Sequence, residues 1–198
     1  MPITEVYVIA EIGSTHDGDF DRALALIETA KACGADAVKL QYWSDSLKLV
    51  GRRSAPDYLD VYERYRVPRG WLAPLAKNCQ KNDIEFMATT YYSEDIAAVA
   101  PLVSNFKVAS FEVRDERFIA DHFKYKKTVI VSTGMCNIER LGRIIALSHR
   151  ILPLHCVSSY PSPMDEMNLL AIQHLDLGAN GGRYGLSDHS TETITGAL

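Results

Sequence analysis

The sequence predicts an α/β protein built as a parallel (β/α)8 TIM barrel, here apparently truncated after its seventh strand. Short, almost entirely apolar, β-rich runs alternate with amphipathic stretches of helical period along the chain. The runs are continuously apolar, which is typical of parallel strands covered by helices on both faces. Nearly every run turns polar at its carboxyl end, and in a barrel these ends open on the face where active sites are built.

Seven runs predict the strands, and in chain order they are 6–13, 37–43, 84–91, 106–113, 128–135, 151–161 and 183–190. A helix is predicted at 19–34, where apolar residues recur at helical spacing and Gly34 provides a carboxyl-terminal stop. Residues 137–150 repeat this pattern. The even spacing of the fourth, fifth and sixth runs favours a closed barrel over an open doubly wound sheet. No G-x-G-x-x-G follows the first run, which disfavours a dinucleotide-binding sheet.

A long connection, from Ser44 to Pro68, interrupts this rhythm after the second predicted strand. Its aromatic residues, together with one just beyond it, are Tyr58, Tyr62, Tyr65 and Trp71. Two interpretations stay open for this segment. It is either a lid or substrate wall on the active-site face, or a structural excursion that packs on the barrel rim.

Composition and charge exclude several classes of protein. With 198 residues, of which 47% are hydrophobic and 23% charged, the chain is expected to fold around a core. The net charge of −4 and the scattered basic residues argue against a nucleic-acid partner. The start lacks a signal-peptide pattern, and no apolar run is long enough to span a bilayer, so a cytoplasmic location without membrane contact is expected. Free buried thiols are expected for Cys33, Cys79, Cys136 and Cys156.

The polar residues at the ends of the runs combine lysines, hydroxyls, carboxylates and histidine. They include Glu11, Lys39, Gln41, Thr89, Lys107, Ser110, Glu112, Ser132, Ser158, Ser187 and His189. Ammonium and hydroxyl donors at one rim suit a phosphate or a phosphorylated carboxylic acid, because several fixed donors must replace the hydration shell of the anion. Lone lysines often extend to solvent instead. His189 could bind a divalent metal, act as an acid or base, or hold structure by hydrogen bonding.

Several sequence blocks, in order, resemble the sialic acid synthase (N-acetylneuraminate synthase) family. The opening VIAEIGSTHDG, followed by a helix and GADAVKLQ, is similar to the family's start, and FKVAS, VIVSTGM, LHCVSSYPSPMDEMNL and GLSDHS follow. This resemblance implies a barrel enzyme that condenses phosphoenolpyruvate with an N-acyl hexosamine resembling N-acetylmannosamine. The products would be a nine-carbon 2-keto acid of the sialic acid type and phosphate. It also implies a divalent metal, Mn²⁺ with Mg²⁺ or Co²⁺ as alternatives, and a homodimer.

The resemblance also assigns roles to matching positions. Phosphoenolpyruvate would be bound by Lys39, Thr89, Lys107, Ser110, Ser132, Ser158 and Ser187. Gln41 and Tyr160 would lie near the sugar, and His189 would bind the metal. Glu112 and Glu11 would be catalytic, with Glu112 assisting proton movement at the sugar. Lys39 and Lys107 would bind and orient the substrate.

The sequence departs from the family pattern at two places. The N-H-N-G motif reads T-H-D-G at 15–18, and Ser158 stands where an asparagine is usual, unless Ser159 aligns there instead. These differences leave the identity of the sugar open. A strand block containing a second metal histidine and an antifreeze-like domain are not in the sequence, so residues 1–198 are expected to be an incomplete catalytic TIM-barrel domain. The chain would be a piece of a longer synthase or a short form that completes its barrel with another chain.

Other functions remain open beside the sialic acid synthase reaction. The chain could be another phosphoenolpyruvate-dependent 3-deoxy-ulosonate synthase, which would require a phosphorylated sugar. It could also be an inactive remnant of this barrel that binds ligand without turnover. A purely structural barrel is disfavoured by the two lysines inside apolar strands.

Overall fold

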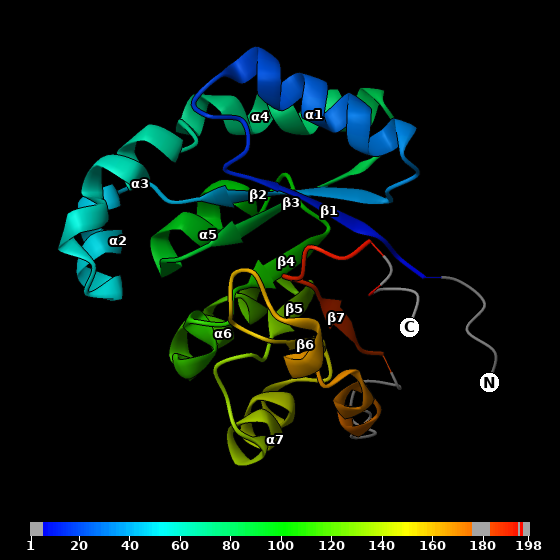
Figure 1. Ribbon diagram of the computed structural model, residues 1–198. Helices are drawn as coiled ribbons and strands as arrows, with labels where there is room; N and C mark the ends of the chain where they lie inside the picture. The colour runs from blue at the N-terminus through cyan, green and yellow to red at the C-terminus, as the bar shows by residue number, and fades with distance from the viewer. Residues whose placement is uncertain (1–5, 176–182, 194, 196–198) are drawn as a thin grey trace. The chain divides into compact units, whose positions relative to one another are not determined.

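The computed structural model describes residues 6–175, 183–193 and 195. The chain divides into two compact units, Met1–Ser104 and Asn105–Leu198. Each unit is an α/β structure in which parallel strands alternate with helices (Figure 1). No helix among the described residues is long and apolar enough to cross a membrane.

The first unit is built on three parallel strands in sequence order, β1 (Ile9–Gly13), β2 (Ala37–Tyr42) and β3 (Glu85–Thr90). Their register sets Glu11 opposite Lys39, and Gln41 opposite Thr89. The core side chains of β2, such as Val38 and Leu40, are fully buried. Lys39 and Gln41 alternate with these apolar residues along β2, and Glu85 begins β3.

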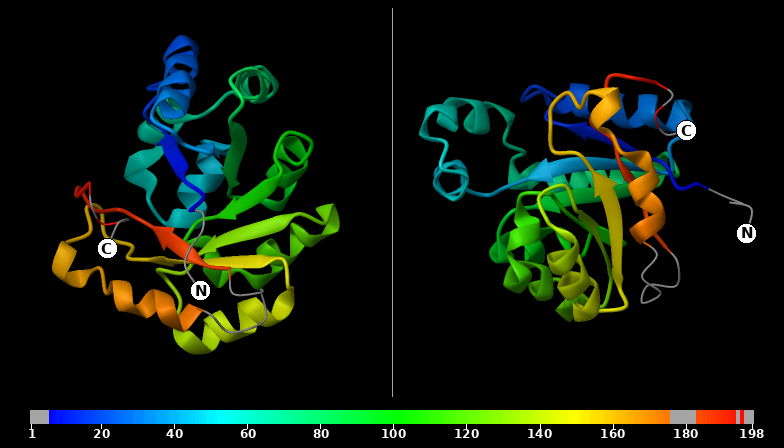
Figure 2. Two further views of the ribbon diagram at one scale, coloured as in Figure 1. Left: turned by 90° about the vertical axis from the view of Figure 1, so that its right-hand side faces the viewer. Right: turned by 60° about the horizontal axis from the view of Figure 1, so that its bottom comes forward.

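Three helices pack on these strands: α1 (Phe20–Ala32), α4 (Arg69–Lys81) and α5 (Ser93–Val99). Helices α1 and α4 lie side by side over one face of the strands (Figures 1 and 2). The α1 helix begins at Asp19, whose carboxylate accepts the backbone N–H of Arg22 at 3.0 Å. Its apolar stripe, Ala23 and Ile27, is fully buried, which confirms the helical period at 19–34.

The long connection contains helices that the sequence interpretation did not predict. They are α2 (Ser46–Arg53), the 3-10 turn η1 (Pro56–Tyr58) and α3 (Leu59–Tyr65). The Tyr62 ring packs on Trp43 with centroids 5.9 Å apart. The Arg64 guanidinium binds the Asp17 carboxylate of the loop before α1 at 2.8 Å. This packing fits a structural excursion, and the substrate wall stays a prediction.

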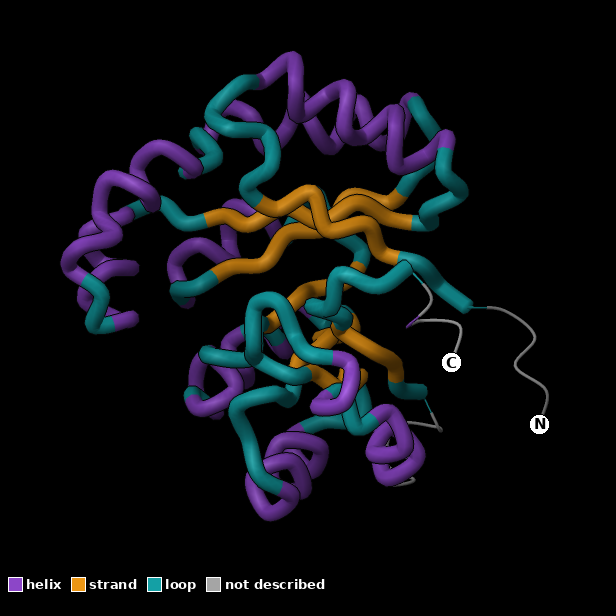
Figure 3. The backbone as a smooth tube through the Cα atoms, viewed as in Figure 1, coloured by secondary structure: helices purple, strands orange, loops and turns teal. Residues whose placement is uncertain are grey.

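The second unit is built on four parallel strands in sequence order, β4 (Asn105–Val108), β5 (Thr128–Ser132), β6 (Ile151–Cys156) and β7 (Gly185–Ser187). Its helices are α6 (Glu116–Asp121) and α7 (Ile138–Leu147), and its 3-10 segments are η2 (Glu112–Arg114), η3 (Phe123–Tyr125), η4 (Met164–Glu166) and η5 (Leu169–Leu175). The helical segments lie outside the strands of this unit, as the purple and orange tubes of Figure 3 show. Buried Val129 and Val131 form the middle of its core.

Several predicted strands are too long. The run 106–113 leaves the sheet after Val108, because the Glu112 N–H donates to the Ala109 carbonyl at 3.1 Å and turns the chain into η2. The run 151–161 leaves it after Cys156. Ser110, Glu112 and Ser158 therefore lie on the loops that follow strands rather than within strands. An apolar or small-residue composition does not distinguish these tight loops from the strands before them.

The four cysteines are all free thiols, as expected. Cys79 and Cys156 are buried, whereas Cys33 is exposed and Cys136 is half-buried. The prediction of burial was therefore wrong for Cys33, which follows the last residue of α1 and caps that helix with its backbone N–H.

Candidate functional site

In the first unit, Lys39 forms the centre of a cluster of predicted site residues. Its side chain is almost fully buried, and its amino group forms an ion pair with Glu11 on the neighbouring strand. The same amino group donates a hydrogen bond to Thr89 Oγ1 at 3.3 Å. An ammonium group withdrawn from water requires such partners, because desolvation disfavours its charge. Adjacent parallel strands thus place a cation, a carboxylate and a hydroxyl together.

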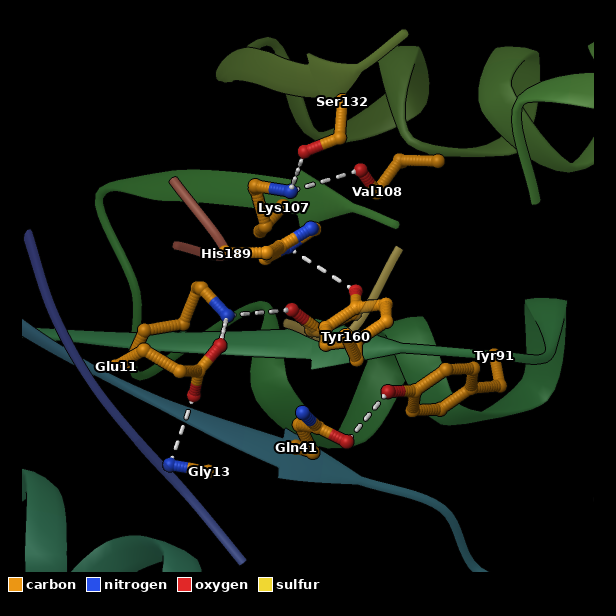
Figure 4. Close-up of polar contacts among 11 residues, drawn as sticks. Glu11, Gly13, Gln41, Tyr91, Lys107, Val108, Ser132, Tyr160 and His189 are labelled. Atoms are coloured by element: carbon orange, nitrogen blue, oxygen red, sulfur yellow. Dashed lines mark hydrogen bonds and ion pairs between the residues drawn. The ribbon is translucent and has the colours of Figure 1, made fainter. Parts of the chain in front are cut away.

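The Glu11 carboxylate is fixed by the backbone after it. Its Oε1 accepts the N–H of Gly13 at 2.7 Å, across an irregularity in the register of β1 (Figure 4). Gly13 has φ +34°, and a Cβ there would lie 3.0 Å from that oxygen. The position of the Glu11 carboxylate therefore requires a glycine at position 13. Gln41 is held separately, since its Oε1 accepts the Tyr91 hydroxyl at 3.0 Å.

In the second unit, Lys107 occupies the corresponding position at the end of β4. Its amino group donates to Ser132 Oγ at 2.6 Å and to the Val108 carbonyl at 3.1 Å (Figure 4). Lys107 and Ser132 are 5% and 2% exposed. The burial excludes the alternative in which this lysine extends to solvent. The structure therefore confirms a buried cation beside a hydroxyl here, as it does at Lys39.

A second cluster in this unit joins Ser110, Cys156 and His189. The Ser110 hydroxyl lies 3.1 Å from the Cys156 sulfur, and His189 Nδ1 lies 3.8 Å from it. Burial alone raises the pKa of the Cys156 thiol, but the contacts with His189 and Ser110 and the charge of Lys107 lower it to about 7. Burial likewise lowers the pKa of His189, and its contacts with Cys156 and the Val157 carbonyl outweigh this and raise it.

The hydrogen bonds of His189 define which ring nitrogen faces a ligand. Its Nδ1 lies 2.7 Å from the Val157 carbonyl, so this nitrogen carries the proton and donates it. The remaining lone pair, on Nε2, accepts the Tyr160 hydroxyl at 3.0 Å. The two rings stack with centroids 4.1 Å apart. Tyr160 is 75% exposed, so its ring covers Nε2 from the solvent side.

Ser158 sits in a tight contact with the loop after β5. A Cβ on Gly134 would lie 2.4 Å from Ser158 Oγ and 2.7 Å from the Cys156 carbonyl oxygen. Only glycine fits this approach. The Ser158 hydroxyl is a buried atom with no hydrogen-bond partner among the described residues, and it is thus available to a ligand.

The two remaining predicted site residues lie in the second unit. Glu112 is fully buried in η2, and Ser187 ends β7 in register with Cys156.

The sequence interpretation missed Cys156, which it treated only as a free buried thiol. Cys156 could have been noticed from its position two residues before Ser158 in the LHCVSS block. Tyr91, the partner of Gln41, was missed as well, because an aromatic residue at a strand end gives no signal of a polar role.

The residues present fit one position of a divalent-metal site. A histidine that donates through Nδ1 to a backbone carbonyl and keeps a lone pair on Nε2 has the arrangement of metal-binding histidines in general. His189 has this arrangement. However, the described residues contain no group of three or more His, Cys, Asp or Glu side chains that could hold an ion. His189 is therefore a candidate for a single ligand of a metal.

Several known proteins similar to this chain are sugar-acid synthases by name. It is 33% identical over 207 residues to the pseudaminic acid synthase of Campylobacter jejuni, covering 94% of this chain and 59% of that protein. It is 32% identical to the N,N'-diacetyllegionaminic acid synthase of Legionella pneumophila, covering 85% of this chain and 53% of that protein. The chain therefore spans less than two thirds of the length of these relatives.

Solved structures support the fold assignment. The N-acetylneuraminic acid synthetase of Leptospira borgpetersenii matches 97% of this chain and 67% of its own with a TM-score of 0.88 and 27% identity. The spore coat polysaccharide biosynthesis protein SpsE of Bacillus subtilis matches 93% of this chain and 53% of its own with a TM-score of 0.78 and 29% identity. Together with the seven parallel strands described here, these matches confirm the predicted TIM-barrel fold class.

The family assignment rests on most of the sequence. The profile of the NeuB family matches residues 26–197, which include all the predicted site residues except Glu11. This match agrees with the predicted resemblance to sialic acid synthases and with the names of the similar proteins. The chain belongs to the NeuB family.

Proposed function

We propose that this chain provides catalytic residues for the condensation of phosphoenolpyruvate with an N-acyl hexosamine, giving a sialic acid-type nine-carbon 2-keto acid and phosphate. The observation that carries the proposal is that each unit holds a buried lysine whose amino group lies beside a hydroxyl, Lys39 with Thr89 and Lys107 with Ser132. Such pairs suit a compact multiply charged anion. The family of sugar-acid synthases supports this reading of the residues.

In this proposal, the two lysines bind and orient phosphoenolpyruvate, and Ser110, Ser158 and Ser187 add neutral donors. The Lys39 amino group would exchange part of its contact with Glu11 for the substrate anion. Burial strengthens these charge-assisted hydrogen bonds, because the local dielectric constant is low. Holding both reactants in register supplies a large part of the rate enhancement.

The reaction forms one carbon–carbon bond and one carbon–oxygen bond, and it breaks one carbon–oxygen bond. The C3 carbon of the enol attacks the aldehyde carbon of the open-chain sugar, water adds at C2, and phosphate leaves with the oxygen that joined it to C2. The water oxygen becomes the C2 carbonyl oxygen and loses both protons, of which one balances the proton taken up by the aldehyde oxygen and the other leaves with the phosphate. We assign proton movement at the sugar to buried Glu112 and place Glu11 as the second catalytic carboxylate. Gln41 and Tyr160 would contact the sugar.

A divalent ion, Mn²⁺ with Mg²⁺ or Co²⁺ as alternatives, is part of the proposal. When bound, it would polarise the aldehyde oxygen as a Lewis acid. His189 Nε2 is the nitrogen that would bind it, after the Tyr160 hydroxyl moves away. The Val157 carbonyl would hold the imidazole in the required tautomer.

The proposal is tested by metal-dependent phosphate release from phosphoenolpyruvate in the presence of different sugars. The panel contains N-acetylmannosamine, its 6-phosphate, a diacetamido-trideoxyhexose and an unacylated pentose phosphate. Release that requires an N-acyl hexosamine supports the proposed reaction. Release that requires the pentose phosphate would assign the chain to another 3-deoxy-ulosonate synthase. Binding of phosphoenolpyruvate with no release from any sugar would support an inactive ligand-binding remnant.

We also propose that the protein acts in carbohydrate biosynthesis, that it is cytoplasmic and forms a homodimer, and that it has no nucleic-acid or membrane partner. The identity of the hexosamine follows from the sugar panel, because the relatives differ in their named products.

A further inference from the structure

A cavity lies in the first unit, next to the carboxyl end of β2 and the residues that follow it. It has a volume of about 410 Å³ and is lined by Tyr42, Trp43, Ser44, Arg66, Val67, Arg69, Glu94, Asp95 and Ala98. None of these residues belongs to the site proposed above. We propose that this cavity binds a small hydroxylated carboxylate, a sugar acid or related hydroxy acid, independently of phosphoenolpyruvate.

The first observation concerns Tyr42. Its side chain is 1% exposed, yet no hydrogen bond to its hydroxyl is formed within the described part of the chain, and the residue lines the cavity. The hydroxyl oxygen is not among the fully buried polar atoms that lack a partner, so it reaches the cavity, where water or a ligand oxygen can pair with it.

The second observation is the pair of guanidinium groups. Arg66 donates to the Ser44 carbonyl at 3.3 Å and lies 3.4 Å from the Glu63 carboxylate. The Arg69 side chain forms no hydrogen bond or ion pair with any described residue. Both arginines line the same cavity as Tyr42. Guanidinium groups bind carboxylates through two parallel hydrogen bonds, so this end of the cavity suits a carboxylate.

The third observation is the buried carboxylate of Asp95, which is 2% exposed. One of its oxygens accepts the Ser44 N–H at 3.0 Å. Asp95 also acts on Tyr42 and is affected by Arg69, so the carboxylate lies in the same group of charges. A carboxylate oxygen accepts hydrogen bonds from ligand hydroxyls.

The charges favour a carboxylate over a phosphate. Arg66 and Arg69 contribute two positive charges to the lining and Asp95 contributes a buried carboxylate, whereas the charge of Glu94 is paired with Lys48. A singly charged anion that places its carboxylate on the arginines and a hydroxyl on Asp95 is therefore favoured. A doubly charged phosphate would suffer more repulsion from the Asp95 carboxylate.

The test uses D-gluconate as the probe, in equilibrium dialysis with the 198-residue protein. D-glucose tests for the need of the carboxylate, and inorganic phosphate tests for a general anion site. Arg69→Met and Tyr42→Phe should each weaken gluconate binding about tenfold, the size expected for a charge-assisted or buried hydrogen bond. Arg117→Met, at an exposed arginine of α6, is the matched control and should bind gluconate as the unaltered protein does.

Tyr42→Phe separates ligand binding from a structural role. Because the hydroxyl has no partner in the described structure, the variant should unfold at the same or a higher urea concentration without gluconate. It should gain less stability than the unaltered protein when gluconate is added.

Several results would overturn the proposal. They are no gluconate binding, equal binding by Arg69→Met, tighter binding of phosphate than of gluconate, and displacement of gluconate by saturating phosphoenolpyruvate. The last result would place gluconate in the proposed substrate site. The condensation assay above does not depend on this cavity, so either proposal can fail while the other stands.

Discussion

Buried lysines are costly residues in a small α/β protein. Lys107 is 5% exposed and holds its amino group between the Ser132 hydroxyl and the Val108 carbonyl. A buried ammonium group that is held by fixed partners is also well placed to bind an anion, because its charge acts in a region of low dielectric constant.

Lys107→Met tests this role, because methionine keeps much of the apolar stem and removes the charge. We expect phosphoenolpyruvate affinity to fall about tenfold to a hundredfold, as for a buried charge-assisted hydrogen bond. Because the variant also removes the donor of the hydrogen bonds to Ser132 and the Val108 carbonyl, we expect a loss of about 1 to 3 kcal/mol in the free energy of unfolding. Calorimetric titration with phosphoenolpyruvate and urea unfolding measure the two effects. Lys77→Met, on α4, is the control, and an equal affinity loss there would contradict the assignment.

Gly134 has a steric role that a substitution can measure. In Gly134→Ala, the new Cβ would overlap Ser158 Oγ and the Cys156 carbonyl oxygen. We expect a loss of about 1 to 3 kcal/mol in the free energy of unfolding, the usual range for overpacking. Gly142→Ala, in α7 with no atom within 4 Å of its Cβ, should instead gain up to about 1 kcal/mol. Urea denaturation of both variants measures these changes. An unchanged free energy of unfolding in Gly134→Ala would contradict the close contact with Ser158 and Cys156.

At the scale of elements, helix α6 is joined to strand β4 through an aromatic cluster. His122, at the end of α6, is fully buried, and its ring packs on Phe106 of β4 and Phe118 of α6 with centroids 5.0 Å and 4.9 Å away. Its Nδ1 lies 2.9 Å from the Phe118 carbonyl. Burial lowers the pKa of His122 from 6.5 to about 4, although that carbonyl acts in the opposite direction.

This lowered pKa predicts a loss of stability in acid. Below pH 6.5 the unfolded chain binds a proton at His122, whereas the native state binds it only near pH 4. The contribution of His122 is therefore fully present above pH 6.5 and is lost as the pH falls toward 4, with a total of about 3 kcal/mol. Urea unfolding at several pH values measures the slope.

The His122→Gln variant should show a flatter dependence of the free energy of unfolding on pH. The variant is also expected to be less stable at pH 7, because the packing around position 122 changes. His149→Gln, at an exposed position, should keep the slope of the unaltered protein. Identical slopes in the His122→Gln variant and the unaltered protein would show that His122 is not the titrating group. His16, whose pKa burial also lowers, contributes a residual slope in every variant.

At the scale of the whole molecule, the metal is the part of the proposal that needs a direct measurement. We expect a chelator to abolish phosphate release and Mn²⁺ to restore it, because the aldehyde oxygen needs a Lewis acid. His189→Gln should weaken Mn²⁺ binding about tenfold or more, measured by equilibrium dialysis without substrates. His149→Gln is the matched control. Full activity in the chelator, or unchanged Mn²⁺ binding by His189→Gln, would contradict the metal assignment.

The sequence predicted the order and type of most elements. Continuous apolar runs mark β2, β3 and β5 well, since strands covered on both faces have few polar residues. It failed for α2 and α3, which occupy the connection after β2. Helix α3 carries charged and aromatic side chains and none of its residues is buried, whereas α2 buries Leu49 and Val50 within only eight residues. Periodicity has little signal for such helices.

The sequence predicted the candidate site well where its residues lie on neighbouring strands in register. It predicted the site less well where contacts between loops bring the residues together. Glu11, Lys39 and Thr89 meet because parallel strands place the carboxyl ends of neighbouring strands together. Cys156 acquires its lowered thiol pKa from the approach of His189 and Ser110 and from the charge of Lys107, all of which are far from it in sequence. The cavity at Tyr42 likewise depends on the packing of segments that lie up to about fifty residues apart.

By itself, the sequence determined the fold class, the family and the set of polar side chains at the strand ends, because these follow from local composition, period and ordered motifs. The tertiary structure decided where the strands end, which nitrogen of His189 keeps its lone pair, why position 134 must be glycine, and that Tyr42 faces a cavity. These properties depend on distances of a few ångströms between segments remote in the chain. The energy of close packing and of buried polar groups changes steeply over such distances, and local sequence patterns do not contain them.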